Sequence, residues 1–343
     1  MPFRVMSWNV ENLFPPGSFS SPTANNPVSQ QEFDDKIAFL ADAISENQPD
    51  VVGLQEIGGS NAADVTCVQA LQDALQGAYP FRAVSAAPDS RRIKVAFLSK
   101  FDLLNQQDIT EFPQGPFASV PNHDGRPPFT EMGRGALKVE VELAAGTRIR
   151  LVTLHLKSKL LTFPGAGGGT GFSTNDENLR AEAAGIALLR RSVEAVTVRT
   201  FLNAVMEDNQ SIHTIVLGDL NDEPKAATSQ IFLGPTDKDI TTADSKDHVR
   251  LYNLTESVPL PGTDRREFLP EAERFTRVHE GRGEILDQII ASRSLIFRDG
   301  DFRVQEVRSL VSLIEGQSIT DNPSDRVGEE ASDHAPVLAQ FDL

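Results

Sequence analysis

Residues 215–222 read IVLGDLND, an apolar run that stops abruptly at a glycine, an aspartate and an asparagine. The apolar half is typical of a short buried strand. Gly218 then allows the backbone to turn or to approach another group closely. Asp219 and Asn221 lie two residues apart, so on an extended backbone they point the same way. By itself this pattern fits either a polar turn or a site of chemistry at the end of a strand.

Polar residues follow other apolar runs in the same way. A first strand is expected over residues 3–10, and it ends at Asn9 and Glu11. A capping box at residues 29–32 predicts a helix, which leads to a second strand over 50–56 that ends in Glu56. Each of these strands therefore finishes in groups that can carry out chemistry.

The elements expected after residue 58 are a helix at 65–75, strands at 81–84, 93–98, 137–143, 149–156, 215–217 and 285–290, and a long helix that starts from a second capping box at 174–177. The alternation over 137–143 predicts a strand with one wet face, so part of the sheet is antiparallel. Because polar strand ends recur from residue 9 to residue 334, we expect one domain over residues 1–343. Loop insertions are expected near 112–133, 160–176 and 222–283.

Length and composition set broad limits on the class of protein. The chain has 343 residues with 39% apolar residues, which is typical of a soluble globular protein. No run approaches the roughly 20 apolar residues of a membrane helix, and the first residues lack the apolar core of a secretory signal. The cytoplasm is therefore the default location, and a secreted form whose signal has been removed is the alternative. Cys67 is the sole cysteine, which excludes an internal disulfide and a cysteine-rich zinc site.

The net charge of −17 weighs against a broad basic face that holds nucleic acid. If the chain acts on nucleic acid, it should do so through a local positive cleft or a bound cation. The candidates for a local positive rim are Arg91, Arg92, Lys94, Arg134, Lys157, Lys159 and Arg180. Lys157 is also a candidate contact to a substrate phosphate.

The polar groups near strand ends form a distinctive set of side chains, and they are Asn9, Glu11, Glu56, His155, Asp219, Asn221, Asp287, Asp333 and His334. Carboxylates with an amide and without cysteine suit a hard cation such as Mg²⁺ or Mn²⁺. Histidines beside them suit acid–base work or contact with phosphate. Together these groups indicate metal-assisted attack of water on a phosphoester.

Six short motifs carry these residues in one order along the chain, and that order resembles the endonuclease/exonuclease/phosphatase (DNase I-like) family of metal-dependent phosphohydrolases. The motifs are SWNVE at 7–11, LQE at 54–56, TLHLK at 153–157, GDLN at 218–221, LDQI at 286–289 and SDHAPV at 332–337. The resemblance implies an α/β (α+β) fold, a four-layer α/β sandwich. In it two mostly antiparallel mixed β-sheets pack face to face, with helices outside.

The resemblance also implies a metal site. Glu56 would be the principal ligand, and Asn9 and Asp333 would complete the site directly or through water. Glu11 is a further candidate ligand. The expected cofactor is Mg²⁺ or Mn²⁺, with Ca²⁺ as a third option.

The remaining residues of the set take catalytic roles by the same resemblance. Asp219 would position or deprotonate the attacking water, and Asn221 would hold a phosphate oxygen. His334, oriented by Asp287, would bind or protonate the phosphate. His155 would contact the phosphate from the other side.

Three functions compete. A nuclease that cleaves phosphodiesters in DNA or another nucleic acid comes first, with the protein as a monomer. A phosphatase or phosphodiesterase of a small phosphoester, such as a phosphoinositide, a nucleotide or a phospholipid headgroup, is the alternative. A non-catalytic binding protein on the same fold comes last, because all of the core site residues are present.

Overall fold

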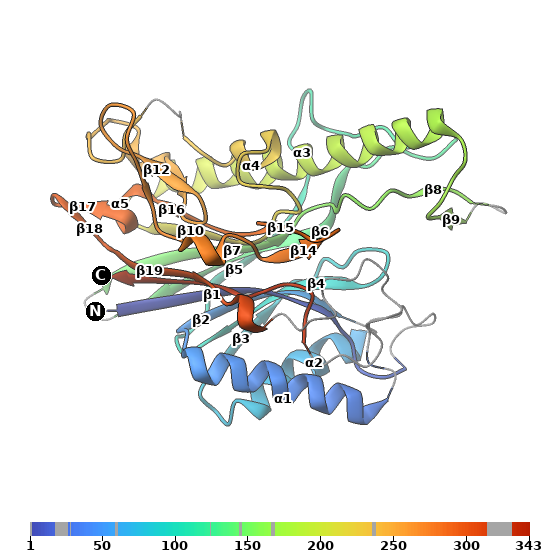
Figure 1. Cartoon of the computed structure of the whole chain (residues 1–343), viewed down its shortest axis with the longest axis horizontal. Coiled ribbons are helices and arrows are strands. Elements are labelled where there is room, and N and C mark those ends of the chain that lie inside the picture. Colours follow the sequence, from blue (N-terminus) through green and yellow to red (C-terminus); the bar gives the residue numbers. More distant parts are fainter. Residues whose placement is uncertain are drawn as a thin grey trace.

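The computed structural model describes residues 2–17, 27, 29–58, 61–123, 125–143, 146–165, 169–234, 238–313 and 331–343. Two six-stranded sheets lie at the centre, with helices on the outer side of each (Figure 1). The helices are α1 (Gln30–Asn47) and α2 (Asn61–Ala74) on one side, and α3 (Glu177–Asp208) and α4 (Ala227–Gln230) on the other. This arrangement confirms the predicted four-layer α/β sandwich.

The first sheet has the strand order β19-β20-β1-β2-β4-β3. Its strands are β1 (Pro2–Leu13), β2 (Val51–Gly58), β3 (Phe81–Val84), β4 (Ile93–Ser99), β19 (Val304–Ser309) and β20 (Val337–Asp342). Strands β1 and β2 are parallel and are connected through α1, as the capping box and apolar spacing predict. Strand β20 pairs antiparallel with β1, so the two ends of the chain lie side by side (Figure 1).

The second sheet has the strand order β11-β16-β10-β7-β6-β5. Its strands are β5 (Leu104–Glu111), β6 (Glu131–Glu142), β7 (Arg148–His155), β10 (His213–Asp219), β11 (Leu251–Asn253) and β16 (Asp287–Ser292). Strand β10 lies between β7, to which it is parallel, and β16, to which it is antiparallel. The apolar run that precedes Gly218 is thus a central, fully buried strand.

Short elements fill the connections between the larger ones. Two-stranded ribbons are formed by β8 (Phe163–Pro164) with β9 (Thr170–Gly171), β12 (Ser257–Pro259) with β13 (Arg265–Glu267), β14 (Arg277–His279) with β15 (Arg282–Glu284), and β17 (Phe297–Arg298) with β18 (Asp301–Phe302). The short helices are η3 (Asp247–Val249), η4 (Glu271–Glu273), α5 (Arg293–Ile296) and η5 (Val311–Leu313). Most of these elements fall inside the predicted insertions 160–176 and 222–283. Within the described ranges, no helix combines the length and apolarity needed to cross a membrane.

The core is divided into three apolar layers, one between the sheets and one between each sheet and its helices. The sheets approach closely at Gly53, where an added Cβ would lie 2.1 Å from Cδ1 of Leu217. On α1, the residues Phe33, Leu40 and Ile44 bury their side chains against the first sheet, since they recur at helical spacing.

Two sequence predictions about these elements are wrong. Strand β6 has no wet face, because Lys138 and Glu140 are buried. Their charges are compensated across strands: Glu140 Oε1 lies 3.2 Å from Lys138 Nζ and 3.6 Å from Arg150 Nε. Helix α3 begins later than the second capping box implies, since Asp176 caps it by accepting the backbone N–H of residues 178 and 179.

Candidate active site

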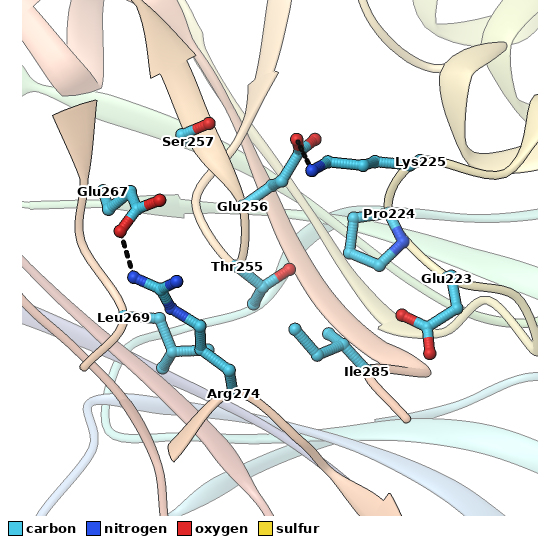
Figure 2. A pocket seen from close by; sticks show the side chains of 10 residues that line it. All are labelled: Glu223, Pro224, Lys225, Thr255, Glu256, Ser257, Glu267, Leu269, Arg274 and Ile285. Carbon is cyan, nitrogen blue, oxygen red and sulfur yellow. Dashed lines mark hydrogen bonds and ion pairs between the residues drawn. The ribbon is translucent and has the colours of Figure 1, made fainter. Parts of the chain in front are cut away.

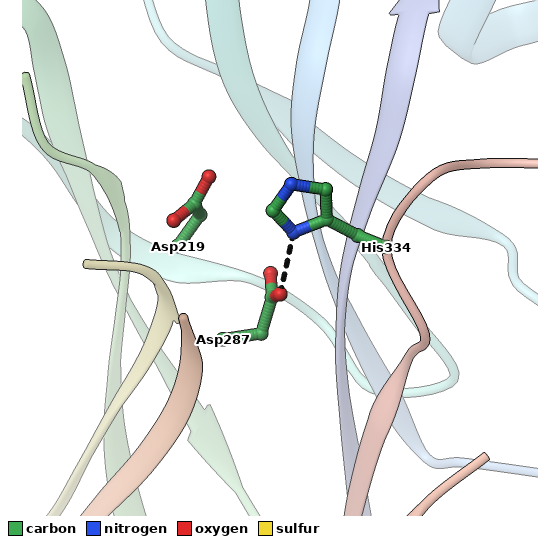
Figure 3. A group of neighbouring side chains, drawn as sticks. All are labelled: Asp219, Asp287 and His334. Atoms are coloured by element: carbon green, nitrogen blue, oxygen red, sulfur yellow. Dashed lines mark hydrogen bonds and ion pairs between the residues drawn. The ribbon is translucent and has the colours of Figure 1, made fainter. Parts of the chain in front are cut away.

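Three strand ends meet beside Asp219, the last residue of β10. In the strand register Asp219 lies opposite His155 of β7 on one side and Asp287 of β16 on the other. His334 comes from the first sheet, in the loop before β20. Figure 3 shows its ring facing Asp219 and Asp287 across the gap between the sheets. The site is therefore built where the carboxyl ends of β7 and β10 and the amino end of β16 meet the loop before β20 of the opposite sheet.

The residues on either side of Asp219 have backbone conformations that only certain residue types adopt easily. Gly218 has φ 151°, and an added Cβ would lie 2.0 Å from the carbonyl oxygen of Leu154 on the neighbouring strand. Only glycine leaves room for that close approach. Asn221 adopts φ 53°, a left-handed conformation that asparagine tolerates. The expectation of an extended backbone through Asn221 is therefore wrong, because the strand stops at Asp219.

Two further carboxylates, Glu11 and Glu56, lie at irregularities in the strands of the first sheet. Strand β1 does not end at Asn9, as expected, but continues through a register shift to Leu13, with Glu11 and Asn12 at positive φ. Strand β2 has a similar shift between Gln55 and Ile57, and Glu56 has φ 60°. A bulge with a left-handed residue turns a side chain out of the regular pleat.

Asp219 is held by three side chains. Nδ2 of Asn9 donates to Oδ2 of Asp219 at 3.1 Å, and Asn221 donates to the two carboxylate oxygens through its backbone N–H at 2.7 Å and its Nδ2 at 3.2 Å. Nε2 of His155 lies 3.3 Å from Asp219 Oδ2 and 3.8 Å from Glu56 Oε1. Nδ2 of Asn221 also donates to the carbonyl oxygen of Leu156 at 3.0 Å, so both of its amide hydrogens are engaged.

Burial shifts the pKa values of Asp219 and His155 in opposite directions. It raises the pKa of Asp219 to about 7, although the nearby charge of His334 acts in the opposite direction. Burial also holds the pKa of His155 well below its usual range, and the positive charges of Arg134 and His334 add to this effect. Asp219 can thus accept a proton near neutral pH, while His155 stays neutral.

His334 and Asp287 form a close pair. Nδ1 of His334 lies 2.6 Å from Oδ2 of Asp287, as the dashed line in Figure 3 marks. Burial disfavours the imidazolium, but the adjacent Asp287 and Asp333 carboxylates outweigh it and raise the pKa of His334 to about 10. The buried carboxylate thus keeps a cationic histidine in the site.

Sequence reasoning missed the residues that fix this pair in place. The Thr276 hydroxyl accepts the backbone N–H of Leu286 at 2.9 Å and of Asp287 at 3.1 Å. Ser332 Oγ donates to the carbonyl oxygen of Asn9 at 2.6 Å, and Trp8 Nε1 donates to the carbonyl oxygen of His334 at 2.9 Å. Ser332 and Trp8 lie inside the recognised motifs and could have been found there. Thr276 lies in the irregular region, where no pattern marks it.

The predicted metal ligands surround the same cluster. Oε2 of Glu56 accepts the backbone N–H of Asn12 at 3.2 Å, and Oε2 of Glu11 accepts the backbone N–H of Asp333 at 2.9 Å. Oδ1 of Asn9 accepts the backbone N–H of Glu11 at 3.0 Å. Asp333 lies between two cations, with Oδ2 at 3.6 Å from Arg277 Nε and Oδ1 at 3.8 Å from His334 Nε2.

This set of donors fits a hard divalent cation. One ligand atom from each of Asp219, Asp287 and His334 lies within 4.8 Å of the others, but His334 can be a ligand only in its neutral form. Among the described residues, Oδ1 of Asp287 is buried and has no hydrogen-bond partner. The carboxylates outnumber the cations that face them, and all available donors except the imidazoles are oxygens, which Mg²⁺ prefers. A bound cation would offset this excess of buried negative charge.

Two hollows are lined by residues close in sequence to the cluster. The first encloses about 390 Å³ and is drawn in Figure 2. Four of its charged side chains form two pairs: Lys225 Nζ lies 3.8 Å from Glu256 Oε1, and Arg274 bonds Glu267. Apolar groups such as Ile285 fill much of the remaining wall. We call this hollow the mixed pocket.

The second hollow encloses about 460 Å³ and is lined by His155, whose Nε2 lies 3.3 Å from Asp219 Oδ2. We call it the cationic pocket, and its charged lining residues are Arg91, Arg126, Arg134, Lys157 and Arg190 with Asp89 and Glu194. Three of these cations were predicted for the positive rim, and two, Arg126 and Arg190, were not.

The other candidates for the rim do not line the cationic pocket. Lys159 Nζ lies 3.7 Å from Asp222 Oδ1 and 3.6 Å from Glu284 Oε1, and Arg180 pairs with Glu177 at 2.6 Å on the exposed start of α3. Arg92 and Lys94 are likewise absent from its lining.

Solved structures share this fold at low sequence identity. The human Nocturnin catalytic domain with bound sulfate anion is 17% identical, with 99% of this chain and 94% of that chain covered and a TM-score of 0.56. Truncated TDP2 from Caenorhabditis elegans is 15% identical, with coverage of 100% and 98% and a TM-score of 0.52. A family protein from Bacteroides thetaiotaomicron is 14% identical, with coverage of 100% and 99% and a TM-score of 0.53.

The comparison with curated proteins found no match. The model of the Endonuclease/Exonuclease/phosphatase family matches residues 6–334, which include all six motifs except the last three residues of the sixth. Members of this family are generally phosphoester hydrolases and typically depend on a divalent metal. The chain belongs to the Endonuclease/Exonuclease/phosphatase family.

Proposed function

We propose that this protein is a divalent-metal-dependent phosphodiester hydrolase that works by in-line attack of water. The observation that carries the proposal is the arrangement around Asp219. A buried carboxylate, oriented by Asn9 and Asn221, faces the His334–Asp287 pair across the gap between the sheets. In-line displacement needs a group that handles water on one side of the phosphorus and a group that stabilises negative charge on the other.

Asp219 is proposed to orient the attacking water and to take its proton on a carboxylate oxygen. Asn9 and Asn221 position Asp219 through the bonds already described. Because both amide hydrogens of Asn221 are engaged within the protein, we assign it this positioning role. Direct contact of Asn221 with a phosphate oxygen remains a prediction.

His334, kept protonated by Asp287, is proposed to donate a hydrogen bond from Nε2 to a phosphate oxygen. A charged donor in a buried site stabilises the charge that develops on the phosphate. His155, which stays neutral, is proposed to contact the phosphate from the side of the cationic pocket. Glu56, Asn9 and Asp333, with Glu11 beside them, would hold the cation. When bound, this cation supplies polarisation of a phosphoryl oxygen.

The substrate class follows from the shape and charge beside the cluster. Nucleic acid is the first choice from the motifs, but the net charge is −17, and five cationic side chains line one pocket of about 460 Å³ beside the cluster. Pockets of this size take small molecules. The cationic pocket therefore favours the alternative, a compact phosphoester.

The test is a comparison of substrates under defined metal conditions. Supercoiled plasmid, bis-p-nitrophenyl phosphate and a mixture of nucleotide and inositol phosphoesters are incubated with the protein in Mg²⁺, in Mn²⁺ and in EDTA. We expect hydrolysis of at least one class in either metal and none in EDTA. Hydrolysis that persists in EDTA, or no hydrolysis of any phosphoester, would contradict the proposal.

A further inference from the structure

We propose that the cationic pocket is a subsite for a second phosphate, a terminal phosphomonoester group carried by the same small substrate whose phosphoester reacts at Asp219. The inference rests on the proposed function, since it names the part of the substrate that extends past His155. It is carried by the positions and hydrogen-bonding state of the side chains that line the pocket.

The pocket holds more positive than negative charge. Five cationic side chains line it against two carboxylates, in a chain whose overall charge is strongly negative. The two carboxylates are also shared with backbone amides. Asp89 Oδ1 accepts two backbone N–H groups, at 2.8 and 2.9 Å, and Glu194 accepts the backbone N–H of Gly133 at 3.0 Å and of Lys157 at 2.6 Å. The guanidinium groups are therefore only partly neutralised.

Hydrogen-bond donors in the pocket lack partners. Arg134 is 8% exposed, and its Nε is engaged by Asp89 at 3.0 Å, but among the described residues its buried Nη1 has no partner. The same is true of Nε of Arg190. A buried donor without a partner is costly, so a site that leaves two of them on residues around one hollow is suited to a ligand rich in acceptors. A phosphate group, with its charged acceptor oxygens, satisfies guanidinium donors well.

The other groups hold the cations in place. Arg190 stacks over the Phe129 ring, with its guanidinium carbon 3.9 Å from the ring centroid, and its Nη2 lies 3.7 Å from Glu194 Oε1. The pKa of Lys157 is lowered to about 8, first by burial and then by repulsion from the positive charges of Arg190 and Arg134. A bound anion would relieve this repulsion.

The walls of the pocket favour the end of a molecule over a continuing chain. Two predicted insertions line it and are bonded to each other, since Arg126 Nη2 donates to the carbonyl oxygen of Gly169 at 2.6 Å and His123 Nε2 lies 2.8 Å from the carbonyl oxygen of Thr162. A polynucleotide passing through would have to run between these contacts. A terminal phosphate fits beside them without breaking them.

The test measures binding in EDTA, so its outcome is independent of whether the protein hydrolyses anything. Adenosine 5′-phosphate and adenosine 3′,5′-bisphosphate are titrated by calorimetry into the wild-type protein. The bisphosphate should bind about 10- to 100-fold more tightly, the gain typical of hydrogen bonds to charged groups. A third ligand carries the 3′-phosphate as a methyl diester and should lose most of this gain. Equal affinity for the first two ligands would overturn the proposal, and equal affinity for the diester and the bisphosphate would overturn the terminal assignment.

Variants locate the effect. Arg134→Gln should lower the ratio of the two affinities by about 10-fold, and Arg91→Gln should lower it by less. The Arg91 side chain is 39% exposed, so Arg91→Gln should leave the core folded. It therefore keeps the test available if the buried Arg134→Gln variant does not fold. Arg148→Gln is the matched control, since Arg148 pairs with Glu142 at the opposite end of β7 from His155. A ratio that is unchanged in both pocket variants, or that falls equally in Arg148→Gln, would sink the assignment. Failure of the hydrolysis screen with this binding pattern intact would sink only the proposed function.

Discussion

The cluster around Asp219 and the cationic pocket lie side by side and share His155, yet they are built in different ways. The cluster is held by the ends and bulges of strands, and its side chains bond to one another. The pocket is formed by two insertions, by the start of β6, by one turn of α3, by the residues after β7 and by the β3–β4 connection, and two of its donors have no partner among the described residues. This difference supports the proposal that the strand ends carry the reaction, while the residues around the cationic pocket select the substrate.

The largest effect should come from the cluster. Asp219→Asn preserves size but removes the proposed proton acceptor, so kcat should fall about 10³-fold, within the range for loss of a general base. The measurement is steady-state hydrolysis of whichever phosphoester the screen identifies, with thermal unfolding to confirm that the variant is folded. Asp176→Asn, which keeps a good helix cap on α3, is the control and should retain full activity. Full activity in Asp219→Asn would refute the assignment.

A smaller loss is expected when His334 loses its carboxylate partner. Asp287→Asn leaves a hydrogen-bonding group near Nδ1 but removes the charge that keeps the imidazole protonated. We expect kcat to fall about 10²-fold with little change in KM, since the effect acts on the transition state. If KM rose and kcat stayed constant, the pair would serve ground-state binding and not catalysis.

The smallest effect should appear in the pocket, as a dependence on pH. Lys157 has a lowered pKa of about 8, so it is protonated below that pH and neutral above it. The phosphomonoester is already dianionic at pH 7, because its second pKa is about 6. The preference for the bisphosphate should therefore fall a few-fold between pH 7 and pH 9. Lys157→Arg, which stays charged throughout, should remove this step, and an identical fall in that variant would show that another group titrates.

Much of the fold could be predicted because its signals are local. The apolar runs before Gly218 and Glu56, the capping box at residue 29 and the order of six motifs correctly predict strands, a helix and a four-layer sandwich. The prediction of burial failed where a side chain is paired with a residue far away in the sequence. The alternation in β6 indicates a wet face, but Lys138 and Glu140 are buried because their charges meet Arg150 on the neighbouring strand. A single domain over residues 1–343 stays a prediction.

In the candidate site, too, the features set by short motifs could be predicted and those set by remote contacts could not. Each motif supplies one or two polar residues near a strand end, and the register of β7, β10 and β16 then brings His155, Asp219 and Asp287 together as expected. The left-handed backbone at Glu56 was not expected, because a bulge is set by both paired strands and not by one. The left-handed backbone at Asn221 was not expected either, because β10 already ends at Asp219. Thr276 was missed because its hydroxyl accepts backbone N–H groups from a segment that begins ten residues further along the chain.

The sequence alone therefore determined the family, the layers and the residues of the cluster, because these depend on short patterns of apolar and polar residues. Only the tertiary structure decided which of the many cations surround His155. Arg134 and Arg190 come from β6 and α3, more than 50 residues apart, and nothing local distinguishes them from the solvated Arg180. A side chain's burial and its remaining unpaired donors depend on the segments that pack around it, and the chain must fold before those segments meet.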